Sequence, residues 1–190
     1  MARLEAVVIG CSAGGLGALK PLLRALTPPL PLPVIVCSHS AEPGTGLLVP
    51  LLARHARLPV REARERWPVE AGIIHLAPPG YHLLIERDRC FAYSVDEPVH
   101  YSRPSIDVLF ESAADAYGAG LAGVMLTGAS PDGAQGLARI RQAGGLAIVQ
   151  DPADALAPTM PQAALDQAGA DHCLPLARIA PLLNELAHCA

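Results

Sequence analysis

The sequence predicts an α/β protein: a doubly wound, mostly parallel sheet with helices on both faces and one antiparallel hairpin. Short, nearly continuous apolar runs alternate with segments of helical spacing, and glycine-containing turns follow the runs. Strands of a parallel sheet are buried on both faces and show this kind of run. Strand–helix alternation favours a parallel sheet covered on both sides. The 190 residues suffice for one core and are few for two, so we expect residues 1–190 to form a single domain.

The first quarter of the chain contains two strand–helix units. Leu4–Gly10 is an apolar run that ends in glycine, and residues 16–26 then follow a helical spacing. Pro21 falls inside this segment and predicts a kink or the true helix start. Val34–Cys37 predicts the second strand, and Gly46–His55 predicts a helix after a loop.

The stretch Val60–Val95 has a different pattern. Its short runs IIHLA, YHLLIE and CFAYSV are separated by Pro78-Pro79-Gly80 and by Arg87-Asp88-Arg89. Turn residues between short runs are typical of hairpins, so we expect antiparallel strands here.

Alternation returns in the second half. Helices are expected at Ser105–Tyr117, with Pro104 at the first turn, and at Gly133–Ala143; strands are expected at Leu121–Leu126 and Leu146–Gln150. Two more helices are predicted at Met160–Gln167 and Leu176–His188.

Composition narrows the class of protein. Hydrophobic residues make up 51% and charged residues 17%, which excludes a disordered chain. The net charge is −4 without a basic run, which argues against a nucleic-acid partner. No apolar stretch reaches the ~18 residues of a membrane span, and the apolar N-terminal run is too short for a signal peptide. The five cysteines are irregularly spaced, so we expect reduced thiols in a cytoplasmic protein without membrane insertion.

The turn after the first strand carries a nucleophile motif. Residues 10–14 read Gly-Cys-Ser-Ala-Gly and satisfy G-x-S-x-G between a strand and a helix. Ser12 would stand at the carboxyl end of the sheet, with the N–H groups of Ala13 and Gly14 as candidate oxyanion donors. The alternative is the glycine-rich turn of a nucleotide-binding domain, but position 12 would then be glycine, and no P-loop occurs.

A serine nucleophile needs a base, and an acid to orient that base. His39 directly follows the second predicted strand, and Asp132 lies in the turn after Leu121–Leu126, so both lie at the edge of the sheet expected for Ser12. His100 is a weaker base candidate. Asp107 and Asp151 are alternative acids, and Asp132 has the competing interpretation of a helix N-cap.

The order Ser, His, Asp differs from the Ser, Asp, His order of α/β-hydrolases. The sequence contains neither H-E-x-x-H nor a Cys/His ligand cluster, so we expect neither a metal nor another cofactor.

Several segments together resemble the CheB-type chemotaxis receptor methylesterases. They are VVIGCSAGG, the strand ending at His39, GIIHLAPPGYHLLI, RPSIDVLF, LTGASPDGAQG and MPQAAL, in the family's order, from about Ala6 to about Leu165. The resemblance implies the fold described above. It also implies hydrolysis of γ-glutamyl methyl esters on chemoreceptor signalling helices with release of methanol, and some members deamidate glutamine there.

By motif position the resemblance places the family's catalytic residues on Ser12, His39 and Asp132. Ala13 replaces a usual threonine and Ala129 a usual methionine beside the pocket. Arg103 begins the RPSIDVLF motif, and we expect either a residue that solvates the loop before the helix or a contact with acidic groups on the receptor.

Family members commonly carry an N-terminal receiver domain, and the sequence has no such segment before the first strand. If the chain is complete, regulation would require a separate receiver or kinase protein, or would be absent. Two alternatives stay open: an esterase or amidase acting on another substrate, and a catalytically decayed receptor-binding module.

Overall fold

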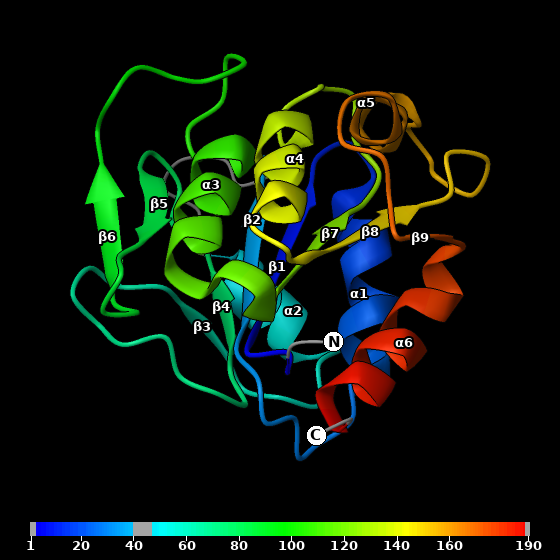
Figure 1. Cartoon of the computed structure of the whole chain (residues 1–190). Helices are drawn as coiled ribbons and strands as arrows, with labels where there is room; N and C mark the ends of the chain where they lie inside the picture. Colours follow the sequence, from blue (N-terminus) through cyan, green and yellow to red (C-terminus); the bar gives the residue numbers. More distant parts are fainter. Residues whose placement is uncertain (1–2, 40–46, 189–190) are drawn as a thin grey trace.

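A seven-stranded sheet forms the centre of the computed structural model, which describes residues 3–39 and 47–188 (Figure 1). The strand order is β3-β4-β2-β1-β7-β8-β9, and all neighbours in it are parallel. These strands are β1 (Ala6–Cys11), β2 (Val34–Ser38), β3 (Val60–Glu62), β4 (Ile74–Leu76), β7 (Leu121–Met125), β8 (Leu146–Gln150) and β9 (His172–Leu174). A separate antiparallel pair consists of β5 (His82–Ile85) and β6 (Phe91–Ser94). The predicted fold class is confirmed.

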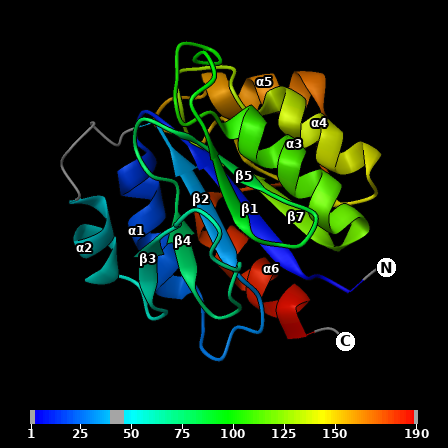
Figure 2. The same ribbon diagram turned by 90° about the vertical axis from the view of Figure 1, so that its left-hand side faces the viewer.

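Helices cover both faces of the sheet (Figures 1 and 2). They are α1 (Gly15–Ala25), α2 (Leu48–Ala53), α3 (Ile106–Tyr117), α4 (Ala134–Gln142), α5 (Thr159–Gln167) and α6 (Leu176–His188), with a short 3₁₀ turn at Gly118–Gly120. α3, α4 and α5 pack on one face, and α1, α2 and α6 pack on the other. Pro21 lies within α1, so the helix does not start there.

Two hydrophobic clusters separate at the sheet because successive strand side chains point to opposite faces. In β1, Ala6 and Val8 belong to the cluster that contains Phe110 of α3. Val7 and Ile9 belong to the cluster that contains α1 and α6. All six residues of β1 are buried, as expected for the middle of a covered parallel sheet.

The prediction for Val60–Val95 is half right. β5 and β6 form the expected antiparallel hairpin, packed on α3. However, Ile74–Leu76 is a parallel strand of the main sheet, between β2 and β3, and not part of a hairpin. Three residues are too few to tell the alternating apolar and polar pattern of a half-buried strand from the continuous apolar run of a buried parallel strand. The sequence therefore could not predict the direction of this strand. β9, at His172–Leu174, also has three residues and was missed for the same reason.

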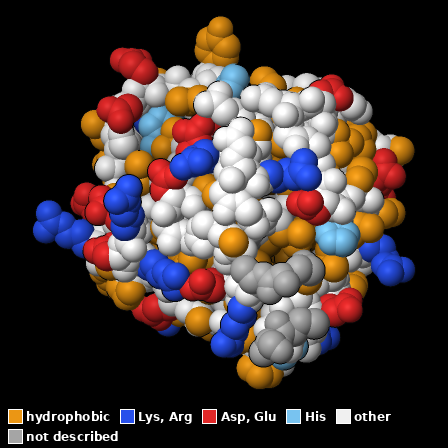
Figure 3. Space-filling view, viewed as in Figure 1, with side chains coloured by type: hydrophobic (Ala, Val, Ile, Leu, Met, Phe, Trp, Pro, Cys, Tyr) orange, Lys and Arg blue, Asp and Glu red, His pale blue; other side chains and the backbone are white. Residues whose placement is uncertain are grey.

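Other predictions concern single segments. The helix predicted at Gly46–His55 is the shorter α2, and Gly46 lies outside the described residues. Cys11, Cys37, Cys90 and Cys173 are free thiols, and Cys189 also lies outside the described residues. Among the helices of residues 3–39 and 47–188, none has the length and hydropathy to cross a bilayer. Acidic and basic side chains are interspersed on the face shown in Figure 3.

Candidate active site

The candidate residues meet where the winding of the sheet reverses. The chain leaves β1 for β2 on one side and later returns to β7 on the other side of β1. Loops at such a switch point diverge and leave a crevice at the carboxyl ends of the strands. Ser12 follows β1, His39 follows β2, and Asp132 lies in the turn between β7 and α4.

The glycines of the nucleophile motif each have a structural reason. Gly14 is the N-cap of α1 in the left-handed region, at φ 78°, which side chains other than glycine rarely adopt. A Cβ on Gly10 would lie 2.5 Å from Cγ2 of Ile106 in α3, so only glycine allows this helix so close to β1. Together they hold Ser12 in a tight strand-to-helix turn.

His39 and Asp132 form a direct pair. Nε2 of His39 lies 2.7 Å from Oδ2 of Asp132, and the side chains are 8% and 0% exposed. The backbone of His39 is fixed beside the nucleophile turn because its N–H donates to the carbonyl of Cys11 at 3.2 Å. The structure thus brings together residues that are 93 positions apart in sequence.

Asp132 accepts more hydrogen bonds than the one from His39. The Ser105 hydroxyl donates to Oδ1 at 2.8 Å, and the N–H groups of Ile106 and Asp107 donate at 2.6 and 3.0 Å. Burial alone would raise the pKa of Asp132, but the bonds from His39 and these three donors outweigh it, and the pKa lies below its usual value. Asp132 is therefore an ionised, acceptor-only carboxylate at neutral pH.

The predicted N-cap role of Asp132 on its own helix is wrong. The N-cap of α4 is Gly133, and no side chain caps that helix. Asp132 instead binds the first N–H groups of α3, while Asp107 of α3 accepts the N–H of Gly136 in α4 at 2.7 Å. Each helix is thus held by a carboxylate from the other segment. Ser105 is the N-cap of α3, as expected for the start of that helix.

The alternative base and acids form other contacts. Nε2 of His100 lies 3.4 Å from Oδ2 of Asp107, and Oδ1 of Asp151 accepts the N–H of Ala153. His100, Asp107 and Asp132 place potential ligand atoms within 4.8 Å of one another. Both oxygens of Asp132 and Oδ1 of Asp107 already accept hydrogen bonds, so we assign no ion to this group.

Two buried residues around the site were not anticipated. The Thr127 side chain joins the nucleophile turn to the loop before α5. His82 is 1% exposed, its Nδ1 accepts the N–H of Ser105 at 3.2 Å, and its Nε2 lies 3.0 Å from the carbonyl of Glu97. A polar residue among apolar neighbours, as in YHLLIE, is the sequence signal that could have pointed to His82.

The predicted pocket residues lie on the turns around Ser12. Ala13 and Gly14 begin the turn into α1, and Ala129 is an exposed residue of the turn between β7 and α4. Arg103 is also exposed, and its Nη1 donates to the carbonyls of Val95 at 2.8 Å and Asp96 at 3.1 Å.

Comparison with known proteins identifies the family. The family model described as CheB methylesterase matches residues 7–183. The chain belongs to the CheB methylesterase family. The crystal structure of the Thermotoga maritima CheB methylesterase catalytic domain superimposes with a TM-score of 0.92 at 30% identity and covers 97% of this chain and 100% of that one.

Curated CheB relatives fall into two lengths. A Leptospira interrogans protein, provisionally named protein-glutamate methylesterase/protein-glutamine glutaminase, is 44% identical over 182 residues, covering 96% of this chain and 94% of the relative. Protein-glutamate methylesterase/protein-glutamine glutaminase 2 of Anaeromyxobacter dehalogenans is 43% identical over 97% of this chain. The chain spans 54% of that second relative's length.

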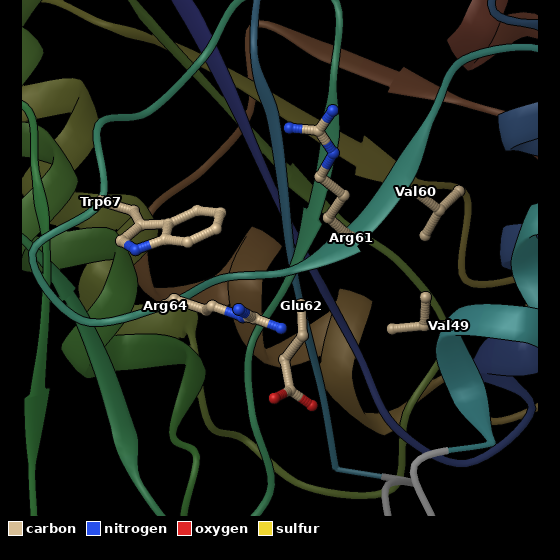
Figure 4. A pocket seen from close by; sticks show the side chains of 6 residues that line it. All are labelled: Val49, Val60, Arg61, Glu62, Arg64 and Trp67. Carbon is tan, nitrogen blue, oxygen red and sulfur yellow. The ribbon is translucent and has the colours of Figure 1, made fainter.

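A hollow of this CheB-family chain lies at the outer edge of the sheet, beside β3 (Figure 4). The guanidinium of Arg64 lies 4.9 Å from the ring centre of Trp67, and Arg61 forms an ion pair with Glu70. The residues that line it are Val49, Val60, Arg61, Glu62, Arg64 and Trp67. None of these six residues is a serine, threonine, cysteine or histidine, so this hollow lacks the nucleophile and the base of the candidate site.

Proposed function

We propose that this chain hydrolyses γ-glutamyl methyl esters on the cytoplasmic signalling helices of chemoreceptors, with Ser12 as nucleophile, His39 as base and Asp132 as the supporting acid. The observation that carries the proposal is the buried contact of 2.7 Å between Nε2 of His39 and Oδ2 of Asp132. It lies at the carboxyl edge of the sheet, where Ser12 follows the last residue of β1. The names of the CheB relatives supply the substrate class and add glutamine deamidation at the same kind of side chain.

The His39–Asp132 bond determines which ring nitrogen can act as the base. Because ionised Asp132 only accepts, the proton of the neutral ring resides on Nε2 of His39. Nδ1 then carries the lone pair and takes the hydroxyl proton as Ser12 attacks the ester carbonyl. Asp132 fixes this tautomer and stabilises the imidazolium that forms.

Oxyanion stabilisation is assigned to the amides of the nucleophile turn. The carbonyl of Ser12 accepts the N–H of Gly15 at 2.7 Å, and the carbonyl of Ala13 accepts the hydroxyl of Thr127 at 2.9 Å. Within the described part of the chain, the N–H groups of Ala13 and Gly14 donate no hydrogen bond. Both are therefore available for a developing oxyanion.

The rest of the cycle follows from the same groups. Protonated His39 returns its proton to the leaving methoxide, and methanol departs. Water, deprotonated by His39, then attacks the glutamyl-serine ester and regenerates Ser12 with a free glutamate carboxylate. The exposed Arg103 would contact acidic groups of the receptor, and a receiver or kinase protein would be a further partner.

Methanol release from a methylated chemoreceptor tests the proposal directly. We expect the chain to release methanol, a fluorophosphonate probe to label Ser12, and Ser12→Ala to abolish both. A folded chain that is labelled and cleaves small acyl esters but leaves the receptor methylated would indicate another ester substrate. A folded, unlabelled and inactive chain would refute catalysis and favour a binding module.

A further inference from the structure

Thr127 contacts the nucleophile turn at two points. It lies two residues beyond β7 and is 2% exposed. Its carbonyl accepts the N–H of Ser12 at 3.0 Å. Its hydroxyl has two acceptors, the carbonyl of Ala13 at 2.9 Å and that of Ala157 at 3.3 Å, and the shorter contact favours Ala13. Thr127 therefore holds both Ser12 and the residue that follows Ser12.

The contacts of Thr127 are themselves fixed. The N–H of Ala157 donates to the Thr127 hydroxyl at 2.8 Å, and the N–H of Thr127 donates to Oε1 of Gln150 at 3.0 Å. Gln150 is 2% exposed and in turn donates to Asp154 at 2.9 Å. The hydroxyl thus has a donor and an acceptor in fixed positions, which leaves it little freedom to rotate away from Ala13.

The bond to Ala13 orients a peptide plane. In a trans peptide the C=O and the following N–H point in opposite directions. Because the Thr127 hydroxyl lies at the carbonyl of Ala13, the N–H of Gly14 points away from Thr127. Gly14 has φ 78°, where the backbone of glycine has no Cβ to restrict it, so an external contact has to fix this plane.

We infer that Thr127 is a positioning residue for the oxyanion-binding amide of Gly14. This inference rests on the proposed function and adds to it the group that holds the amide ready before the substrate arrives. An amide that is fixed in advance stabilises the transition state without reorganising during the reaction, and a displacement of about 1 Å is enough to cost ~100-fold in rate. The effect of Thr127 should therefore appear in kcat and not in KM.

Thr127→Val tests the inference because it keeps the shape of the side chain and removes the hydroxyl. We expect kcat for methanol release to fall ~10- to 100-fold, with KM within about twofold of wild type. Thr127→Ser retains the hydroxyl and should recover kcat to within about threefold of wild type. Thr127→Ala takes the place of the valine variant if circular dichroism shows that Thr127→Val does not fold.

Ser112→Ala is the matched control. The Ser112 hydroxyl also bridges two segments, donating to the carbonyl of Leu109 and accepting the N–H of Ile85 at 3.1 Å, but it joins α3 to β5. Its loss should lower the melting temperature and leave kcat unchanged. A fall in kcat equal to that of Thr127→Val would mean that Thr127 acts only through general stability, and the inference would be overturned.

The remaining outcomes separate the inference from the proposed function. If wild type is labelled by the fluorophosphonate but releases no methanol, the labelling rate replaces kcat, because phosphonylation also develops negative charge on an oxygen near Ser12. Equal labelling or turnover rates in Thr127→Val and wild type would overturn the inference while the function stands. No labelling of folded wild type would overturn both.

Discussion

At the scale of single residues, Asp132 illustrates how burial and hydrogen bonding oppose each other. Its side chain is fully buried, which disfavours the charged form, yet four donors hold its pKa below the usual value. A carboxylate that accepts several N–H and O–H bonds stays ionised even where water is excluded. The charge of Asp132 thus persists next to His39.

Asp132→Asn is expected to reduce turnover by about 10³- to 10⁴-fold, since an asparagine amide facing His39 stabilises the wrong tautomer. The same aspartate-to-asparagine change in the triad of a trypsin-like protease lowers turnover by about 10⁴-fold. Methanol release from methylated receptor gives the rate, and thermal unfolding of the same sample shows whether the fold persists. Turnover at the wild-type rate would remove Asp132 from the mechanism.

Leu156 is a second single residue, and its position suggests a role in substrate recognition. It is 82% exposed, yet its Cδ2 lies 2.8 Å from where a Cβ on Gly14 would stand, so it lies directly beside the nucleophile turn. The backbone next to it is fixed, because the carbonyl of Ala157 accepts the N–H of Gly128 at 3.0 Å. An exposed leucine next to a reactive serine is suited to contact an apolar side chain of a receptor helix.

Leu156→Gln should raise KM for methylated receptor about tenfold, because a buried leucine contact of about 1.5–3 kcal/mol is lost in the complex. Steady-state kinetics on the receptor provide the measurement. The same variant acting on a small acyl ester is the control, and there both constants should match wild type. An unchanged KM on the receptor would show that the substrate does not touch Leu156.

At the scale of elements, α3 and α4 pack closely against each other at Gly136. A Cβ on Gly136 would lie 2.6 Å from Cβ of Phe110 and 3.0 Å from the carbonyl of Asp107. The N–H of Gly136 also binds Asp107 directly. This packing positions the start of α3, whose N–H groups bind Asp132.

Gly136→Ala is therefore expected to destabilise the protein by about 1–3 kcal/mol, because the Cβ of Phe110 and the backbone of Asp107 cannot move easily to make room for the added methyl group. Gly17→Ala is the matched control: Gly17 is an exposed residue of α1 with nothing within 4 Å of an added Cβ. Alanine there should be neutral or stabilise by up to about 1 kcal/mol. Urea unfolding of the two variants checks the contrast, which fails if both shift the midpoint equally.

The limits of the sequence prediction are also visible at this scale. β8 and α6 have the predicted bounds because Leu146–Gln150 and Leu176–His188 are long enough to show their pattern. β4 has three residues, and its parallel direction depends on pairing with β2, which is distant in sequence. Likewise, G-x-S-x-G pointed to Ser12, whereas the contacts of Thr127 depend on how separate loops meet in space.

At the scale of the whole molecule, two neighbouring carboxyl groups make opposite contributions to stability as pH changes. The lowered pKa of Asp132 stabilises the fold above its unfolded value near 3.8, and this contribution is lost as pH falls through the folded pKa. Burial raises the pKa of Asp107 to about 6, and the negative charges of Asp132 and Glu111 raise it further. The hydrogen bond from the N–H of Gly136 and the charge of His100 act in the opposite direction. Folded Asp107 thus holds a proton that the unfolded chain has released, and stability falls as pH rises from about 4 to 6.

Asp107→Asn removes this titration while the amide oxygen can still accept the N–H of Gly136. Its stability relative to wild type should therefore rise by on the order of 2–3 kcal/mol between pH 4 and pH 6–7, and then level off. Urea unfolding of both proteins at pH 4, 5, 6 and 7 measures that difference. Asp115→Asn, at a half-exposed carboxylate on the same helix, is the control variant. If the stability difference between Asp107→Asn and wild type stayed constant from pH 4 to pH 7, folded and unfolded Asp107 would share one pKa, and burial would not oppose its ionisation.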